Sequence, residues 1–149
     1  MELSLDIENY GLALSDDDPV GEDPRYLDEF DLIRSEIEKM AGNDFELIAS
    51  RSRYILLEQS KDLRVGGYLL LALTYLNGIK GLIEGLSIYN EMLASFGATL
   101  HPLRPSAKAS AIKWLNSAKL EAYIEKETLS DITTFTHLKK LIDTLNTLI

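Results

Sequence analysis

The chain has 149 residues, a formal net charge of −9 and 46% apolar residues, as expected for one globular domain. It contains no cysteine, which excludes disulfides and thiolate metal sites. Its first residues lack the basic and apolar regions of a signal peptide, and the uncharged run from Val65 is shorter than the roughly 20 residues of a membrane-spanning helix. The composition therefore predicts a cytoplasmic protein.

Negative charge is concentrated in the first third of the chain. Residues 1–46 hold fifteen acidic and three basic side chains, whereas residues 47–149 hold nine and twelve. An acidic segment repels phosphate backbones, which argues against a nucleic-acid partner. It is either a solvated face or a surface that attracts a basic protein, with Asp16, Asp17 and Asp18 as candidate contacts.

Residues 1–22 show no sustained hydrophobic period, and we interpret them as an extended or loosely docked acidic leader before a helical domain at 23–149. Asp23 and Pro24 provide an N-cap and a proline at the first helical position. Apolar residues three or four positions apart then predict an amphipathic helix that ends at Gly42. They are Tyr26, Phe30, Ile33, Ile37 and Met40.

Two further helix starts are predicted from capping residues. Asn43 with Glu46 resembles a capping box. Ser60 is expected to cap the following helix, with Asp62 in its first turn.

The middle of the chain predicts two closely packed helices. Residues 68–76 are apolar on nearly every side, which indicates a helix buried all round, and Gly78 ends it. Glycine inside a helix costs about 1 kcal/mol relative to alanine. Gly81 and Gly85 therefore predict close backbone approach, since no strand precedes them and no Gly-Lys-Ser/Thr follows to make a phosphate loop. Apolar residues stripe this second helix: Leu82, Leu86, Tyr89, Leu93 and Phe96.

The last third predicts a connector and two helices. Residues 99–105 contain two prolines and are expected to be non-helical. Ser106 opens a helix that contains Ala111, Trp114, Leu115, Ala118 and Ala122. Thr128 with Asp131 resembles a capping box before a stripe of Ile132, Phe135, Leu138, Ile142 and Leu145. The sequence thus predicts an all-α fold, a compact bundle of about six helices with an irregular acidic leader.

Catalytic and metal-binding patterns are missing from the sequence. His101 and His137 are the two histidines, and there is no Gly-x-Ser-x-Gly, His-x-x-x-His or Glu-x-x-His. A partial calcium-loop pattern from Asp16 fails, because Val20 and Leu27 stand where oxygen ligands are needed. We expect no enzymatic activity, no metal and no cofactor, with a small helical enzyme as the alternative of another class. His101 is expected to make a loop-capping hydrogen bond and His137 to be exposed.

Two charged groups are candidates for partner binding. In the first, Arg64 can bind a carboxylate through two N–H groups, and Asp62 can cap while pairing with Lys61 or Arg51. The structural interpretation, which we favour, is that this cluster locks one helix start against its neighbour. The second candidate is a basic strip, which either docks an acidic partner or is solvated: Lys108, Lys113 and Lys119.

Five motifs in a fixed order resemble the ImpA-related N-terminal domain of TssA-type proteins of the bacterial type VI secretion machine. They are Pro19-Val-Gly21-Glu-Asp23 with Tyr26-Leu-Asp28-Glu-Phe30, Asp44-Phe45, the glycine-bearing hairpin from Ser60 to Leu86, His101-Pro102, and Ala111 to Leu115. Phe45 stands where the family usually has tryptophan, and Ser95-Phe96-Gly97 replaces an aromatic-Trp pair. Both departures keep apolar bulk, so they bear on the subfamily rather than on the fold.

The resemblance implies a non-enzymatic scaffold that coordinates baseplate, tail tube and sheath assembly through protein contacts. The implied partners are protein subunits of the baseplate, the tube and sheath, or the membrane complex, with no nucleic acid and no membrane insertion; self-association is left open. A second interpretation within the same system is a relative that caps or anchors the distal end of the sheath. Family members are generally longer, so we expect this domain to be part of a longer protein.

Overall fold

The structure is a computed structural model that describes residues 7–116, 120 and 132–148. Its main helices are α2 (Asp28–Glu38), α3 (Phe45–Tyr54), α4 (Leu63–Asn77), α5 (Ile79–Phe96), α6 (Pro105–Lys113) and α8 (Ile132–Leu148). Short 3₁₀ segments cover Pro24–Tyr26, Gly97–Thr99 and Trp114–Asn116, and a π-helical segment covers Ile55–Gln59. Among the described residues there is no strand, which confirms the all-α prediction. None of these helices is long and apolar enough to cross a lipid bilayer.

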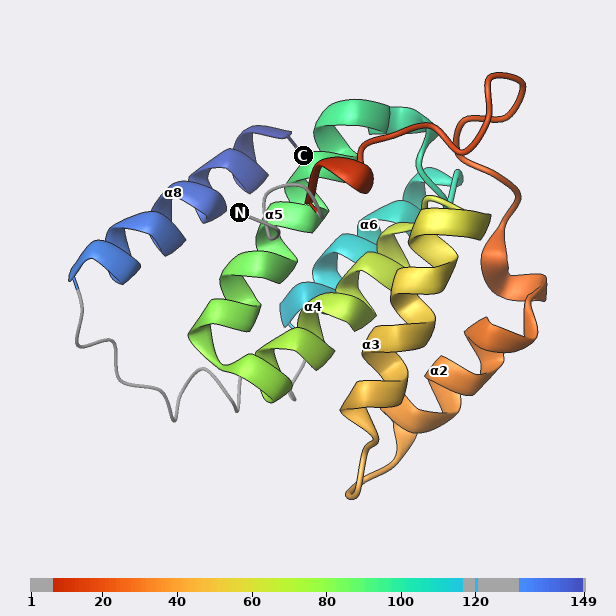
Figure 1. The fold of residues 1–149 in the computed structure, drawn as a ribbon. Helices are drawn as coiled ribbons and strands as arrows, with labels where there is room; N and C mark the ends of the chain where they lie inside the picture. Colours follow the sequence, from red (N-terminus) through yellow and green to blue (C-terminus); the bar gives the residue numbers. More distant parts are fainter. Residues whose placement is uncertain (1–6, 117–119, 121–131, 149) are drawn as a thin grey trace.

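Helix α4 lies at the centre of the fold (Figure 1). It packs against α5 on one side and α3 on the other, and α6 also contacts it. The outer helices extend this arrangement, since α2 packs on α3 and α8 packs on α5. Helix α4 is therefore in contact with helices that precede it and helices that follow it in the sequence.

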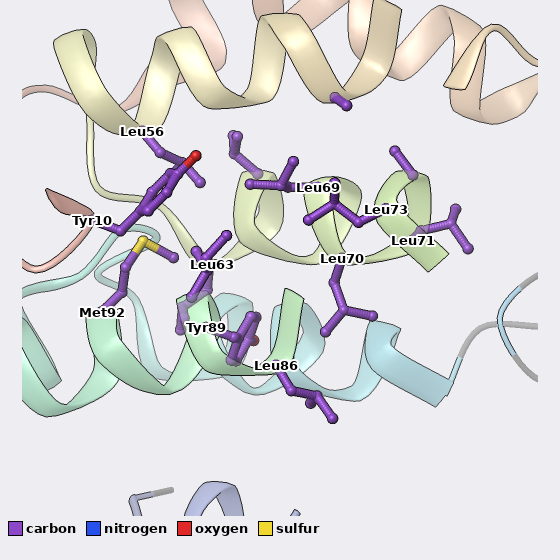
Figure 2. Close-up of a cluster of buried hydrophobic side chains, with 14 of the residues drawn as sticks. Tyr10, Leu56, Leu63, Leu69, Leu70, Leu71, Leu73, Leu86, Tyr89 and Met92 are labelled. Atoms are coloured by element: carbon purple, nitrogen blue, oxygen red, sulfur yellow. The ribbon is translucent and has the colours of Figure 1, made fainter. Parts of the chain in front are cut away.

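The hydrophobic core is built on both faces of α4, as its uniformly apolar sequence predicts. In Figure 2, Leu69 and Leu73 are on the side of α4 toward α3, and Leu70 is on the side toward Leu86 of α5. Tyr10 joins the same core, with 1% of its surface exposed, and its ring lies near Leu56 and Met92 in Figure 2.

Glycines allow α4 and α5 to approach closely, as predicted. A Cβ on Gly85 would lie 2.8 Å from the Leu70 Cα, and one on Gly81 would collide with the Leu73 carbonyl. Gly78 joins the two helices with φ of 68°, a conformation that favours glycine. Close packing thus explains glycine inside α5.

The apolar stripe predicted from Tyr26 to Met40 is wrong at both ends. Both residues lie outside α2, and they are 83% and 97% exposed, whereas Phe30 and Ile33 are buried. Asp23 caps the 3₁₀ turn Pro24–Tyr26 and not α2, which begins at Asp28. The extended backbone of Leu27 separates this turn from α2, so the helical period does not continue back to Tyr26.

Two predicted caps are also wrong. Asn43 does not open α3; its side-chain amide donates to the Glu36 and Lys39 carbonyls and closes the end of α2, which stops before Gly42. Asp44 caps α3 instead by accepting from the Leu47 N–H. Likewise Asp62, and not Ser60, caps α4.

The two ends of the chain differ in part from expectation. Near the N-terminus, Tyr10 is held in place because its hydroxyl accepts a 2.8 Å hydrogen bond from Arg53, which also pairs with Glu84 at 3.0 Å.

The division into leader and domain after residue 22 stays a prediction. In α8, Leu145 is buried but Ile142 is exposed. Several predicted features lie outside the described residues: Ala118, Lys119, Ala122, Thr128 and Asp131.

Candidate functional site at the start of α4

Three distant segments meet at the start of α4 and hydrogen-bond through their backbones. The Lys61 N–H donates to the Val20 carbonyl at 2.7 Å, and the His101 N–H donates to the Lys61 carbonyl at 3.1 Å. Leu63 N–H then donates to the His101 carbonyl at 2.9 Å. We call this meeting point the α4 junction: residues 20–23, 60–64 and 101. It unites three of the motifs that the sequence presents separately.

His101 closes the α4 junction with its side chain. The residue is 7% exposed, and its Nε2 lies 2.7 Å from the Gly21 carbonyl oxygen. A carbonyl can only accept, so Nε2 carries the proton and donates. This confirms the expected loop hydrogen bond, although the sequence did not indicate that Gly21 is the acceptor. His137, as predicted, is exposed.

An ion-pair chain links Asp62, Arg64 and Asp23. Arg64 donates to the buried Asp62 carboxylate from Nε and Nη2, the latter at 2.6 Å, and Nη2 also reaches Asp23 at 2.9 Å. Burial raises the pKa of Asp62, while the bonds from Arg64 and the Val65 N–H act against that rise. Partial burial also acts to raise the pKa of Asp23, but the Arg25 N–H and the Arg64 guanidinium hold it below its ordinary value. Arg64 therefore makes the predicted bidentate contact with a carboxylate, that of Asp62.

Lys61 is a buried cation, with 1% of its surface exposed. Its ammonium donates to the Leu56 carbonyl at 2.7 Å and lies 5.6 Å from the centre of the Phe96 ring. Burial lowers the pKa of Lys61 to about 8, although Glu58 acts to raise it. The expected pairing of Asp62 with Lys61 or Arg51 is wrong, since Asp62 is bound by Arg64 and Lys61 turns to Leu56.

The charged side chains at the start of α4 bond other groups of the protein, whereas the buried Ser60 hydroxyl makes no hydrogen bond with a described residue. Lys61 and Asp62 are buried, so any part they play in partner binding, which stays a prediction, is indirect and passes through the half-buried Arg64. This geometry favours the structural interpretation, in which the cluster locks the helix start. Among the described residues, no three His, Asp or Glu side chains are placed to hold a metal ion.

The remaining predicted contacts lie on other parts of the surface. Asp16, Asp17 and Asp18 are exposed, and Asp18 accepts from the Gly21 N–H at 3.2 Å. Lys113 is exposed, but the Lys108 ammonium bonds the Ala98 carbonyl at 2.6 Å, which ties α6 to the preceding turn. Binding through the acidic residues or through Lys108 and Lys113 stays a prediction.

Comparison with known proteins agrees with the motifs. Residues 12–117 match the family model described as ImpA, N-terminal, type VI secretion system. The N-terminal domain of the TssA component from Burkholderia cenocepacia, which includes the conserved ImpA_N region, superposes with a TM-score of 0.69 at 26% identity. That match covers 73% of this chain and 45% of the solved one, so this chain spans less than half of that structure. No curated protein matches the chain. Because the family model covers most of the sequence and includes the residues of the α4 junction, the chain belongs to the ImpA N-terminal family of the type VI secretion system.

Proposed function

We propose that this domain is a non-enzymatic assembly component of the type VI secretion system that acts in the cytoplasm. In this role it coordinates baseplate, tail tube and sheath subunits by binding them. Membership of the ImpA N-terminal family supports the proposal.

The non-enzymatic role is supported by the hydrogen bonds that the motif residues make inside the protein. At the α4 junction, His101 bonds Gly21, Lys61 bonds Leu56, and Arg64 bonds Asp62. Side chains that are bonded in this way stabilise the fold and are not free to bind a substrate. A fold held in this way offers its exposed surfaces for protein contacts.

Direct binding tests this proposal. The purified chain would be titrated against purified baseplate, tube, sheath and membrane-complex subunits of the same secretion system, with an unrelated helical protein as control. We expect saturable binding to at least one subunit. Absence of binding to every subunit would contradict the scaffold role, and binding confined to the distal sheath end would favour the capping relative.

A further inference from the structure

Two neighbouring hollows lie between α6 and the first turns of α4, and we call them together the groove. They have volumes of about 400 and 360 Å³ and share Arg64 and Ala107 in their walls. We call the first hollow the basic end and the second the aromatic end. The basic end is also lined by Asp23, Arg25, His101, Pro102, Leu103 and Arg104, and the aromatic end by Tyr68, Ser110, Ala111 and Trp114.

The basic end is positively charged on a strongly acidic protein. Three of the six arginines in the sequence line it, Arg25, Arg64 and Arg104, with Asp23 in its wall and the buried Asp62 bound to Arg64 behind it. Asp23 binds Nε of Arg25 and Nη2 of Arg64, but Arg104 is exposed and makes no ion pair with a described residue. Guanidinium groups bind carboxylates through two parallel hydrogen bonds. This hollow is therefore suited to a carboxylate from outside.

The start of α6 adds to this preference for an anion. Arg104 is the N-cap residue, Pro105 is the first helical residue, and no side chain caps the helix. The N–H groups of Ser106 and Ala107 have no acceptor within the helix, and they carry the positive end of its dipole. A carboxylate in the basic end meets these groups as well as Arg104.

The aromatic end offers a firm apolar surface one helical turn away. The Tyr68 and Trp114 rings meet edge to face with centroids 5.1 Å apart. A Cβ on Gly67 would lie 3.1 Å from the Trp114 ring, so the indole rests on the α4 backbone and is held in place. Both aromatic residues are half-buried, which leaves part of each ring available to an apolar side chain.

We propose that this groove binds a segment of a partner protein in which an acidic side chain lies about one helical turn from an apolar or aromatic one. The spacing follows from Arg64 and Tyr68, which are four residues apart on α4 and so about 6 Å apart along it. Charge complementarity selects an acidic segment, since the groove is basic while the protein as a whole carries −9. This inference rests on the proposed function and names the surface that performs it.

Three variants distinguish the groove from the rest of the protein surface. Arg104→Glu reverses the charge at the basic end, and an acidic residue at a helix N-terminus is favourable, so the fold is retained. Ser110→Trp fills the aromatic end from an exposed position. Lys80→Glu is the control, because it reverses an exposed charge outside the groove at a position that is not a predicted contact.

The test is selection of random linear peptides displayed on phage against the purified chain, followed by affinity measurement on the enriched peptides. We expect peptides with an acidic residue three or four positions from an aromatic or large aliphatic one. Arg104→Glu and Ser110→Trp should each weaken binding about tenfold or more, and Lys80→Glu should leave it nearly unchanged. Melting curves of all variants confirm that each is folded.

Other outcomes would overturn the proposal. Enriched peptides without an acidic residue, no enrichment, or equal loss with Lys80→Glu would each contradict it. Full competition by inorganic phosphate, with no effect of Ser110→Trp, would indicate a simple anion site. Self-association in sedimentation that Arg104→Glu abolishes would assign the groove to a second copy, through its own acidic segment. Secretion subunits that bind the wild type and Arg104→Glu equally would refute the groove while leaving the proposed function intact.

Discussion

The ammonium group of Lys61 is held inside the protein by one carbonyl oxygen and one aromatic ring. Removing a cation from water lowers its pKa, here to about 8, because burial penalises the charged form. In the unfolded chain the same group retains its proton to about pH 10. The residue therefore links folding to proton release at moderately alkaline pH.

The free energy of unfolding should rise between pH 8 and pH 10. In that window the unfolded chain binds a proton that the folded Lys61 has lost, so stability increases with pH, by on the order of 2 kcal/mol. Above pH 10 the buried Tyr89 acts in the opposite direction, since burial raises its pKa and only the unfolded form ionises there. Urea unfolding across this range measures the slope.

Lys61→Met should remove most of this pH dependence. At pH 7 the variant loses the bond to the Leu56 carbonyl but also loses a buried charge, so the two effects partly cancel. The exposed Lys113→Met is the control and should keep the wild-type slope. Identical slopes for Lys61→Met and wild type would show that Lys61 keeps an ordinary pKa in the folded protein.

At the scale of elements, the sequence predicts helices better than their ends. Periodicity indicated α4 and α5, and glycine spacing indicated their close approach, because both depend on local chemistry alone. The start of α4 could not be predicted in the same way, since Ser60 and Asp62 are both good N-cap residues. Their roles are decided by the bonds of Lys61 to Val20 and His101, which join segments about forty residues apart in sequence. Tyr10 was missed for the same reason, as its partner Arg53 is distant along the chain.

Adding one methyl group between α4 and α5 tests their packing. Gly81→Ala and Gly85→Ala should each lower the free energy of unfolding by roughly 1–3 kcal/mol, because the new Cβ meets the backbone of α4, which cannot move aside. This loss exceeds the roughly 1 kcal/mol that alanine gains in helix propensity. Chemical denaturation measures the net change in the free energy of unfolding, in which the new contact and the gain in helix propensity are combined.

Gly66→Ala is the matched control for these two substitutions. Its Cβ would first meet the end of the Met92 side chain, a flexible thioether that can change rotamer. We expect a smaller loss than at Gly81 or Gly85. Equal stability changes at all three positions would argue against backbone contact as the reason for glycine in α5.

At the scale of the whole molecule, charge is divided between two surfaces. Asp16 and Asp17 are exposed in the acidic segment, whereas Arg104 lines the basic end of the groove. Composition predicted the acidic segment, because a cluster of neighbouring aspartates is visible in the sequence. The groove could not be predicted, since Arg25, Arg64 and Arg104 are far apart along the chain and only the fold brings them together.

If the acidic segment steers a basic partner, neutralising it should slow association. Asp16→Asn with Asp17→Asn should lower the on-rate for the bound secretion subunit at low salt, with little change in the off-rate. The difference should fade as the Debye length shrinks from about 10 Å at 0.1 M to about 3 Å at 1 M salt. Asp18 is left intact because it bonds Gly21. Surface plasmon resonance gives both rates, and an unchanged on-rate at low salt would exclude steering, with the exposed Asp143→Asn as control.

The role in the secretion machine is tested most directly by imaging fluorescently labelled sheaths in the bacterium that encodes this chain. We expect that deleting the gene greatly reduces the number of assembled sheaths, and that restoring the wild-type gene returns it. Sheaths that assemble and contract normally without the gene would contradict the assembly role.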